Sequence, residues 1–380
     1  MDFYTAAMLI GGATVLPGLL SLVLCYWVRI IAPRWGLMDR PGGRKIHTQP
    51  TPLGGGLAVW ASMMLFFVGL VCGLLVMQAV PAGRALLPPL VNEHWQGLKS
   101  RVPDLAVVLL GSTLLMLLGL WDDRRGLPWT WRLAAQFLIA AALVFSQGDD
   151  WRLTAFVAWR PVTYSLSILW IVALVNAFNM LDNMDGLSAG VATIVALLLA
   201  AFLLCPPATV TEGPQLFVGG FLLVLSGSLL GFLWHNRPPA RLFLGDAGSY
   251  FIGFCLAVAT LVATYASYES SQRHAVLAPV CLMAVPLYDM VTVVLIRLRQ
   301  GRSPFEGDRN HFSHRLVALG FSRWGAVLTI YLTSATCGLA AIVLPRVDWP
   351  GAICVVLMVL CVLWLIWLLE YTATKHQNKS

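Results

Sequence analysis

Long apolar stretches recur along the whole of this 380-residue chain, and they restrict its possible folds more than any other feature. About 20 apolar residues in a row are enough to cross the hydrocarbon core of a bilayer as a helix. Only 11% of the residues are charged, against about 25% in a typical soluble domain. We therefore predict an all-α, polytopic membrane protein that forms one domain over residues 1–380.

We count eleven apolar stretches, although two of them are short enough to leave ten as the alternative. The basic residues predict how these spans are oriented, because Lys and Arg are enriched in cytoplasmic loops. Most of the 25 Lys and Arg residues fall on the inner side if the N-terminus is outside and the C-terminus is cytoplasmic. The net charge of +7 is then a topology signal and gives no reason to expect nucleic acid as a partner. The spans are 6–31, 54–78, 104–121, 132–147, 163–179, 186–204, 216–233, 248–266, 276–296, 324–344 and 350–370, and the predicted cytoplasmic loops are 32–53, 122–131, 180–185, 234–247 and 297–323.

The second of these loops begins with two adjacent carboxylates in "GLWDDRRG" (119–126). Asp122 and Asp123 repel each other, so each raises the pKa of the other unless a cation lies nearby. Arg124, Arg125 or a divalent metal ion are the candidates for that cation. The alternative is an ordinary helix end at the membrane interface, but acidic residues close to the bilayer are usually functional.

The third loop carries a polar residue at every third position of "NAFNMLDNMDG" (176–186). On a helix this spacing places Asn176, Asn179, Asp182 and Asp185 on one face. Carboxylate and amide oxygens on one face suit Mg²⁺, which is usually held by one or two carboxylates together with substrate phosphates. The alternative is a solvated turn, because Asn, Asp and Gly favour turns.

The fourth loop ends in "LFLGDAGSY" (242–250), where Asp246 stands between glycines at the start of a span. The first backbone amides of such a helix point out of its N-terminus and form a natural phosphate site. We expect these amides to face substrate. The alternative is that Asp246 only caps its own helix.

Cations gather in the first and last loops. "RKIH" (44–47) holds Lys45 and His47, and "GRSPFEGDRNHFSHRL" (301–316) holds Arg302, His311 and His314. Arg binds phosphate oxygens bidentately, and His donates or accepts protons near neutral pH. Each group alone is equally typical of a topology anchor. Acids for a metal ion and cations for phosphates, all in loops of one side, favour phosphoryl transfer.

The motifs resemble, in the same order, those of the polyprenyl-phosphate N-acetylhexosamine-1-phosphate transferase family. Its paired aspartates match 122–123, its N-x-x-D-G-x-D-G motif matches 179–186, and its N-x-x-P-A-x-x-F-x-G-D-x-G-S motif matches 236–249. The resemblance implies a multi-pass enzyme of the bacterial inner membrane with its active site at the cytoplasmic face. Such an enzyme uses Mg²⁺, or Mn²⁺ in its place, to transfer a sugar 1-phosphate from a UDP-N-acetyl sugar to undecaprenyl phosphate, and it releases UMP.

The resemblance also implies roles for single residues. Asp246 would be a metal ligand, with Asp122 and Asp182 beside the ion, and Lys45 would reach the diphosphate. Uridine would contact Asn236, Phe243 and Asp185. The full catalytic set is Asp122, Asp123, Asp182, His311 and Lys45, and the substrate-binding set is Asn179, Asp185, Asn236, Phe243, Gly245, Arg302, His314 and His47.

Two departures from the family pattern bear on the sugar. Ser313 replaces one histidine of the last motif, and Asn183 replaces the usual glycine between the aspartates, where we expect Asn to tolerate a positive φ. The last loop is closest to the GlcNAc-1-phosphate branch, so GlcNAc is the predicted sugar. GalNAc, the deoxysugars QuiNAc and FucNAc, and MurNAc-pentapeptide remain alternatives. The sequence leaves a homodimer open, and a membrane transporter is the alternative from another class.

Overall fold

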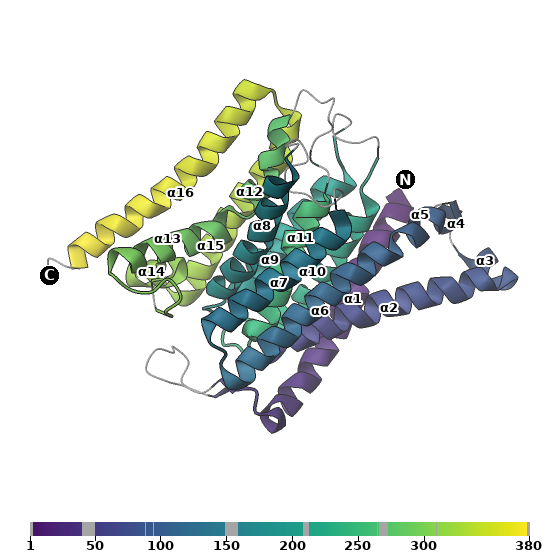
Figure 1. Cartoon of the computed structure of the whole chain (residues 1–380), viewed down its shortest axis with the longest axis horizontal. Helices are drawn as coiled ribbons and strands as arrows, with labels where there is room; N and C mark the ends of the chain where they lie inside the picture. Colours follow the sequence, from purple (N-terminus) through teal and green to yellow (C-terminus); the bar gives the residue numbers. More distant parts are fainter. Residues whose placement is uncertain are drawn as a thin grey trace.

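The computed structural model describes residues 3–39, 50–87, 89–93, 95–148, 159–207, 213–263, 265, 273–308 and 310–377. Ten helices in this part of the chain are long and apolar enough to cross a membrane, and a bent pair of helices makes an eleventh span. Both predicted counts, ten and eleven, are thus accounted for by the same structure. The helices form one bundle (Figure 1).

The elements follow the predicted spans closely. In chain order they are α1 (Phe3–Ile31), η1 (Ala32–Trp35), β1 (Met38–Asp39), β2 (Thr51–Pro52), α2 (Gly55–Ala79), α3 (Pro81–Leu86), α4 (Pro89–Glu93), α5 (Trp95–Ser100), α6 (Val102–Arg125), α7 (Trp129–Gln147), α8 (Arg160–Leu181), α9 (Leu187–Leu204), α10 (Leu216–Asn236), α11 (Gly245–Val262), η3 (Arg273–Leu277), α12 (Ala278–Leu282), α13 (Ala284–Arg299), α14 (Phe312–Ala318), α15 (Arg323–Val343), η4 (Leu344–Arg346) and α16 (Trp349–Gln377).

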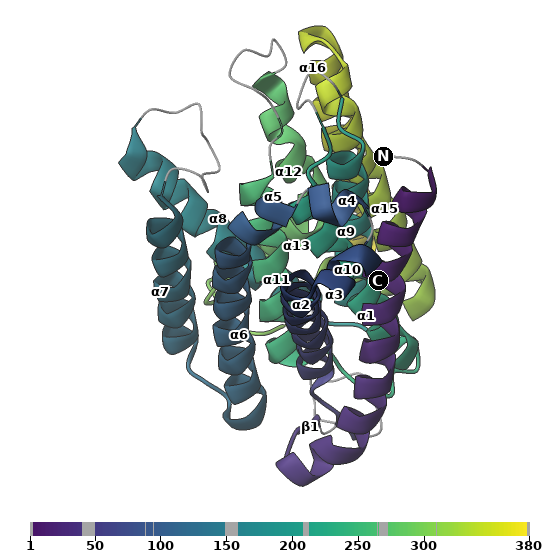
Figure 2. The same cartoon turned by 90° about the vertical axis from the view of Figure 1, so that its right-hand side faces the viewer.

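Helix α11 forms the centre of the bundle, and α16 lies at its edge (Figure 1). In α11, 89% of the most apolar 18-residue window is buried, because α2, α6 and α8 pack around it. In α16 the corresponding share is 11%, and large side chains such as Trp364 and Leu365 are exposed. A helix that is apolar on all sides but exposed in the protein is suited to contact lipid. Helices α1, α2, α6 and α7 form one side of the bundle (Figure 2).

A close crossing of α6 and α11 determines where their ends meet. A Cβ atom added at Gly119 of α6 would lie 2.3 Å from the carbonyl oxygen of Asp246. Only glycine permits this approach, which brings the last turn of α6 against the first turn of α11. The paired aspartates of α6 therefore lie beside Asp246.

The predicted span 276–296 is broken. The helices Arg273–Leu282 and Ala284–Arg299 meet at an angle of 66°. Pro286 has no amide to donate to the carbonyl of Leu282, and its ring would clash with that carbonyl in a continuous helix. The break at Met283 follows from this proline. Beyond the break, α13 packs against α8 and α15.

Candidate active site

The five predicted loops meet at one end of the bundle, and hydrogen bonds join them. The amide of Phe243 donates to the carbonyl of Pro52 at 2.9 Å, which links the fourth loop to the first. The fourth loop also binds the second and third loops, and the third binds the last, through contacts described below. The prediction that these segments come together is confirmed. The membrane side on which they lie stays a prediction.

Asp123 caps the N-terminus of α11. Its Oδ1 accepts from the amide of Asp246 at 2.8 Å and its Oδ2 accepts from the amide of Ala247 at 3.1 Å. We expected these amides to face a phosphate, and that expectation is wrong in this structure because a carboxylate from α6 occupies them. A direct catalytic role for Asp123 stays a prediction, and its observed contacts hold Asp246 in place.

Gly245 makes this capping possible. Its φ is +75°, in the left-handed region where glycine pays no steric penalty. A Cβ atom at this position would lie 2.6 Å from Oδ2 of Asp123. The predicted substrate-binding role of Gly245 is thus joined by a structural one, since only glycine lets Asp123 reach the helix end.

Asp246 itself points to α8 and does not cap its own helix. Its Oδ1 accepts from Asn179 Nδ2 at 2.6 Å, and the same amide group lies 3.1 Å from the Oγ of Ser249. Among the described residues, Asp246 has no ion-pair partner. Asn179 is therefore placed to orient the predicted metal ligand, which extends its predicted role in substrate binding.

Asp182 and Asp185 lie on a turn, not on a helix. Helix α8 ends at Leu181, so the predicted common helical face is wrong for these two residues. Burial, reinforced by the negative charges of Asp123 and Asp185, raises the pKa of Asp182 to about 8. A carboxyl group in this state has excess negative charge around it, which a cation would relieve.

Asp122 is the acid of this centre that does have a cation beside it. Its Oδ2 accepts from Arg132 Nη1 at 2.8 Å and from the hydroxyl of Tyr250 at 3.1 Å, while its Oδ1 accepts from the amide of Leu127. We predicted Arg124 or Arg125 in this role, and both instead are exposed at the end of α6. With both oxygens engaged, Asp122 is better suited to hold Arg132 than to bind a metal ion.

Asn236 ties two loops together. Its Oδ1 accepts from the amide of Gly186 and its Nδ2 donates to the carbonyl of Leu242, both at 2.9 Å. Beside it, Oδ2 of Asp185 accepts from the amide of Ala240 at 2.9 Å. The predicted contacts of Asn236 and Asp185 with uridine remain predictions, and their present contacts give the turn 182–186 a defined position.

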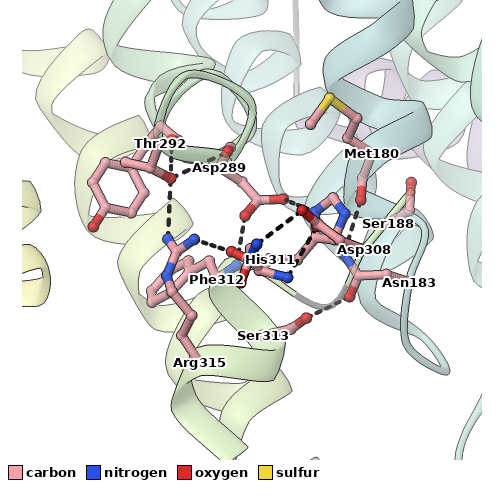
Figure 3. Close-up of polar contacts among 12 residues, drawn as sticks. Met180, Asn183, Ser188, Asp289, Thr292, Asp308, His311, Phe312, Ser313 and Arg315 are labelled. Carbon is pink, nitrogen blue, oxygen red and sulfur yellow. Dashed lines mark hydrogen bonds and ion pairs between the residues drawn. The ribbon is translucent and has the colours of Figure 1, made fainter. Parts of the chain in front are cut away.

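The two residues that depart from the family pattern, Ser313 and Asn183, contact each other. The hydroxyl of Ser313 donates to the side-chain oxygen of Asn183, and Nδ2 of Asn183 donates to the carbonyl of Met180 (Figure 3). Asn183 does not have a positive φ, so our expectation on that point is wrong; the positive φ of this turn belongs to Gly186. The contact fastens the first turn of α14 to the acidic turn.

The basic residues predicted for the site do not all lie beside the acids in the described part of the chain. Lys45 and His47 lie outside the described residues, although Asp39 and Thr51, which border that segment, pair in the β1–β2 hairpin. Arg302 is not brought to the acids; it forms an exposed ion pair with Glu306 at 2.7 Å. His311 is buried beside Asp289, and the His314 ring lies 6.3 Å from the His311 ring. Phe243, by contrast, is half-buried in the loop just before α11.

Two residues of this region were missed by sequence reasoning. Arg132 was taken as part of an apolar span, and Asp289 lies within the span 276–296. Both had a usable signal, because an ionisable residue inside a membrane span is rare and usually functional. Their partners depend on the packing of α7 on α6 and of α14 on α13, which the sequence does not show.

The acids fit a divalent ion that substrate helps to bind. Within the described part of the chain, no three His, Cys, Asp or Glu side chains are grouped to hold a metal ion by themselves. Mg²⁺ needs only one or two carboxylates when phosphate oxygens complete its shell. Asp182 and Asp246 supply such carboxylates in an environment with surplus negative charge.

Comparison with known proteins agrees with this geometry. Residues 105–264, which include the paired aspartates and Asp246, match the model of glycosyl transferase family 4. A decaprenyl-phosphate N-acetylglucosaminephosphotransferase of Mycolicibacterium smegmatis is 33% identical over 349 residues, covering 83% of this chain and 78% of the relative. The chain belongs to glycosyl transferase family 4.

Other relatives are similar to this chain over most of their length. A probable undecaprenyl-phosphate N-acetylglucosaminyl 1-phosphate transferase of Bacillus subtilis is 29% identical over 329 residues, 85% of this chain and 81% of the relative. An undecaprenyl-phosphate alpha-N-acetylglucosaminyl 1-phosphate transferase of Yersinia pestis is 27% identical over 87% of this chain and 83% of its own. Family membership makes the chain an enzyme of the phosphotransferase type, and the transporter alternative is set aside.

Proposed function

We propose that this family 4 enzyme transfers GlcNAc 1-phosphate from UDP-GlcNAc to undecaprenyl phosphate, at the cytoplasmic face of a bacterial inner membrane. The observation that carries the proposal is the meeting of Asp182 and Asp246 at the bundle end, with Asp123 beside them and no cation paired to any of the three among the described residues. The divalent counter-ion of a donor diphosphate would compensate that surplus negative charge. The lipid acceptor explains why such a centre lies at the end of membrane helices.

The cofactor in this proposal is Mg²⁺, with Mn²⁺ as a substitute, held by Asp246 and Asp182. The bound ion would neutralise diphosphate oxygens and stabilise the charge that develops during transfer. Asn179 orients Asp246, and Asp123 fixes the backbone that carries it. These contacts keep the carboxylates in place before substrate arrives.

In the proposed reaction an oxygen of the acceptor phosphate attacks the sugar-bound phosphorus of the donor. The bond from that phosphorus to the bridging oxygen breaks, and UMP leaves with that oxygen. Arg132, held by Asp122, supplies positive charge beside the acids. Phosphoryl transfer depends mainly on such positioning and electrostatics.

A covalent route through Asp182 is the rival mechanism. In it, the Asp182 carboxylate attacks the donor first, UMP leaves, and the lipid phosphate then displaces the aspartate. Direct transfer predicts that UMP is released only when acceptor is present. Ping-pong kinetics, or UMP formed without lipid, would support the covalent route.

The test of the proposed function is transfer of radiolabel from UDP-[³H]GlcNAc into butanol-extractable lipid by purified enzyme with undecaprenyl phosphate. A panel of UDP-GalNAc, UDP-QuiNAc, UDP-FucNAc and UDP-MurNAc-pentapeptide is assayed in parallel. Labelled lipid with UDP-GlcNAc as the best donor is the expected result. A better rate with another donor would correct the sugar, and no transfer from any of them would contradict the proposal.

A further inference from the structure

Asp289 is a fully buried carboxylate in an otherwise apolar stretch of α13, and its exposed fraction is 0%. Its two oxygens serve the start of α14. Oδ1 accepts from the backbone amide of Phe312 at 2.6 Å, and Oδ2 lies 2.9 Å from Nδ1 of His311 (Figure 3). Burying a carboxylate is costly unless its hydrogen bonds are satisfied. Both of these bonds go to residues of one turn, so Asp289 has a single, defined target.

The contact selects one form of the His311 ring. An ionised carboxylate only accepts hydrogen bonds, so Nδ1 of His311 carries a proton and donates it to Asp289. The second ring nitrogen, Nε2, then becomes the atom that is available to another group. Among the described residues, none hydrogen-bonds to Nε2 of His311. The His311 side chain is buried, with an exposed fraction of 8%.

The same turn of α14 is fastened to the acidic centre from its other side. Ser313, two residues after His311, donates to Asn183, which lies between Asp182 and Asp185 in the chain. One network of polar contacts therefore runs from α13 through the start of α14 to the acidic turn (Figure 3). A change in how Asp289 holds this turn reaches residues next to the proposed metal ligands.

We propose that Asp289 is a positioning residue for transfer: it holds His311 in the form protonated at Nδ1 and leaves Nε2 to contact the phosphates of the substrates. This inference rests on the proposed function, because it needs His311 to act on substrate. Second partners of this kind fix the orientation and tautomer of a functional histidine, and their loss commonly costs about 10- to 100-fold in activity. Asp289 itself does not touch substrate.

The decisive variant is Asp289→Asn. Its amide oxygen still accepts from the Phe312 amide, so the start of α14 keeps its cap, but its NH₂ group meets Nδ1 of His311 as a donor. The ring must then accept at Nδ1 and carry its proton on Nε2. We expect kcat to fall about 10- to 100-fold with KM for the UDP-sugar changed less than about threefold. The melting temperature should stay close to that of the wild type.

A double-mutant cycle separates positioning from a general structural role. In a His311→Ala background the ring is gone, so Asp289→Asn should cause less than about a twofold further loss. A structural role for Asp289 would lower activity again in that background. Glu370→Gln is the matched control, because Glu370 is a second buried carboxylate on this helix group that binds Tyr288 and Arg315 but not His311. Its activity should stay within about threefold of the wild type.

Selective ¹⁵N labelling of histidine gives a second measurement that does not depend on a variant at Asp289. The chain has 7 histidines, and His311→Ala identifies the signal of interest. A wild-type His311 protonated at Nδ1 supports the inference, and protonation at Nε2 alone overturns it. Full activity of either Asp289→Asn or His311→Ala also overturns it. Failure of the proposed function looks different, since the wild-type enzyme would then transfer no sugar phosphate from any donor.

Discussion

Two groups of carboxylates in this protein differ in whether each acid has a basic partner. In the acidic centre, Asp123 is bound by backbone amides and Asp246 by Asn179, and Asp182 has a raised pKa. Around α13 and α14, each buried acid has a basic partner. These pairs are Asp289 with His311, Asp308 with Arg297 and Glu370 with Arg315. In the function we propose, the acids without a basic partner are where a cation binds, whereas the paired acids belong to the framework that holds the loops.

The strongest test of this contrast compares Asp246→Asn with Asp308→Asn. Removing the Asp246 charge should lower turnover by about 100-fold or more, because charge stabilisation at the reacting phosphates depends on it. It should leave the melting temperature unchanged or higher, since like charges lie nearby. Asp308→Asn should lower the melting temperature, because Arg297 loses its buried partner. Wild-type turnover in Asp246→Asn would refute its assigned role.

Gly245→Ala tests whether the acidic centre depends on the cap that Asp123 provides. The added methyl group meets Oδ2 of Asp123 in a backbone conformation with φ of +75°, so both the cap and the turn are strained. We expect about 1–3 kcal/mol lower stability and a clear loss of turnover, measured by thermal unfolding and lipid labelling. Gly69→Ala on α2, where nothing lies within 4 Å, is the control and should behave as wild type.

Ser313→Ala tests the contact that joins the two regions. Loss of one hydrogen bond should reduce stability by about 0.5–1.5 kcal/mol and turnover by a few-fold. Asn183→Ala should have a similar effect, and the double variant should be no worse than either one. Additive losses in turnover would show that the two side chains act separately.

The pH dependence of stability tests the paired region. Burial disfavours ionisation of Asp308, but hydrogen bonds from Arg297 and Asn310 outweigh it and lower its pKa from 3.8 to about 2. A carboxyl with a lowered pKa stabilises the fold above its ordinary pKa, and this gain is lost as pH falls to the folded-state value. The difference in melting temperature between wild type and Asp308→Asn should therefore shrink between about pH 4 and pH 2. A constant difference across that range would contradict the ion pair.

The sequence predicted the fold well because a bilayer demands long apolar helices, and these are visible as hydropathy alone. It did not predict the break at Met283, where the effect of Pro286 depends on which helices can accept the tilt. The acids of the site were also found from sequence, since carboxylates next to apolar spans are conspicuous.

The sequence did not reveal which residues bind those acids through hydrogen bonds and ion pairs. Arg124 and Arg125 are adjacent to Asp122 in the chain, yet Arg132 from the next helix binds it, because a helix turns neighbouring residues to different sides. The role of Asp123 as a cap for α11 likewise depends on the close crossing at Gly119. Contacts of this kind come from packing between distant segments, which residue spacing does not encode.

The claim at the centre of this account is that the unpaired acids bind a divalent ion on which transfer depends. Lipid labelling from UDP-GlcNAc by enzyme freed of metal with EDTA tests it directly. The account predicts no labelled lipid in that state and recovery of the full rate when Mg²⁺ or Mn²⁺ is added back. A full rate in the presence of excess EDTA would contradict it.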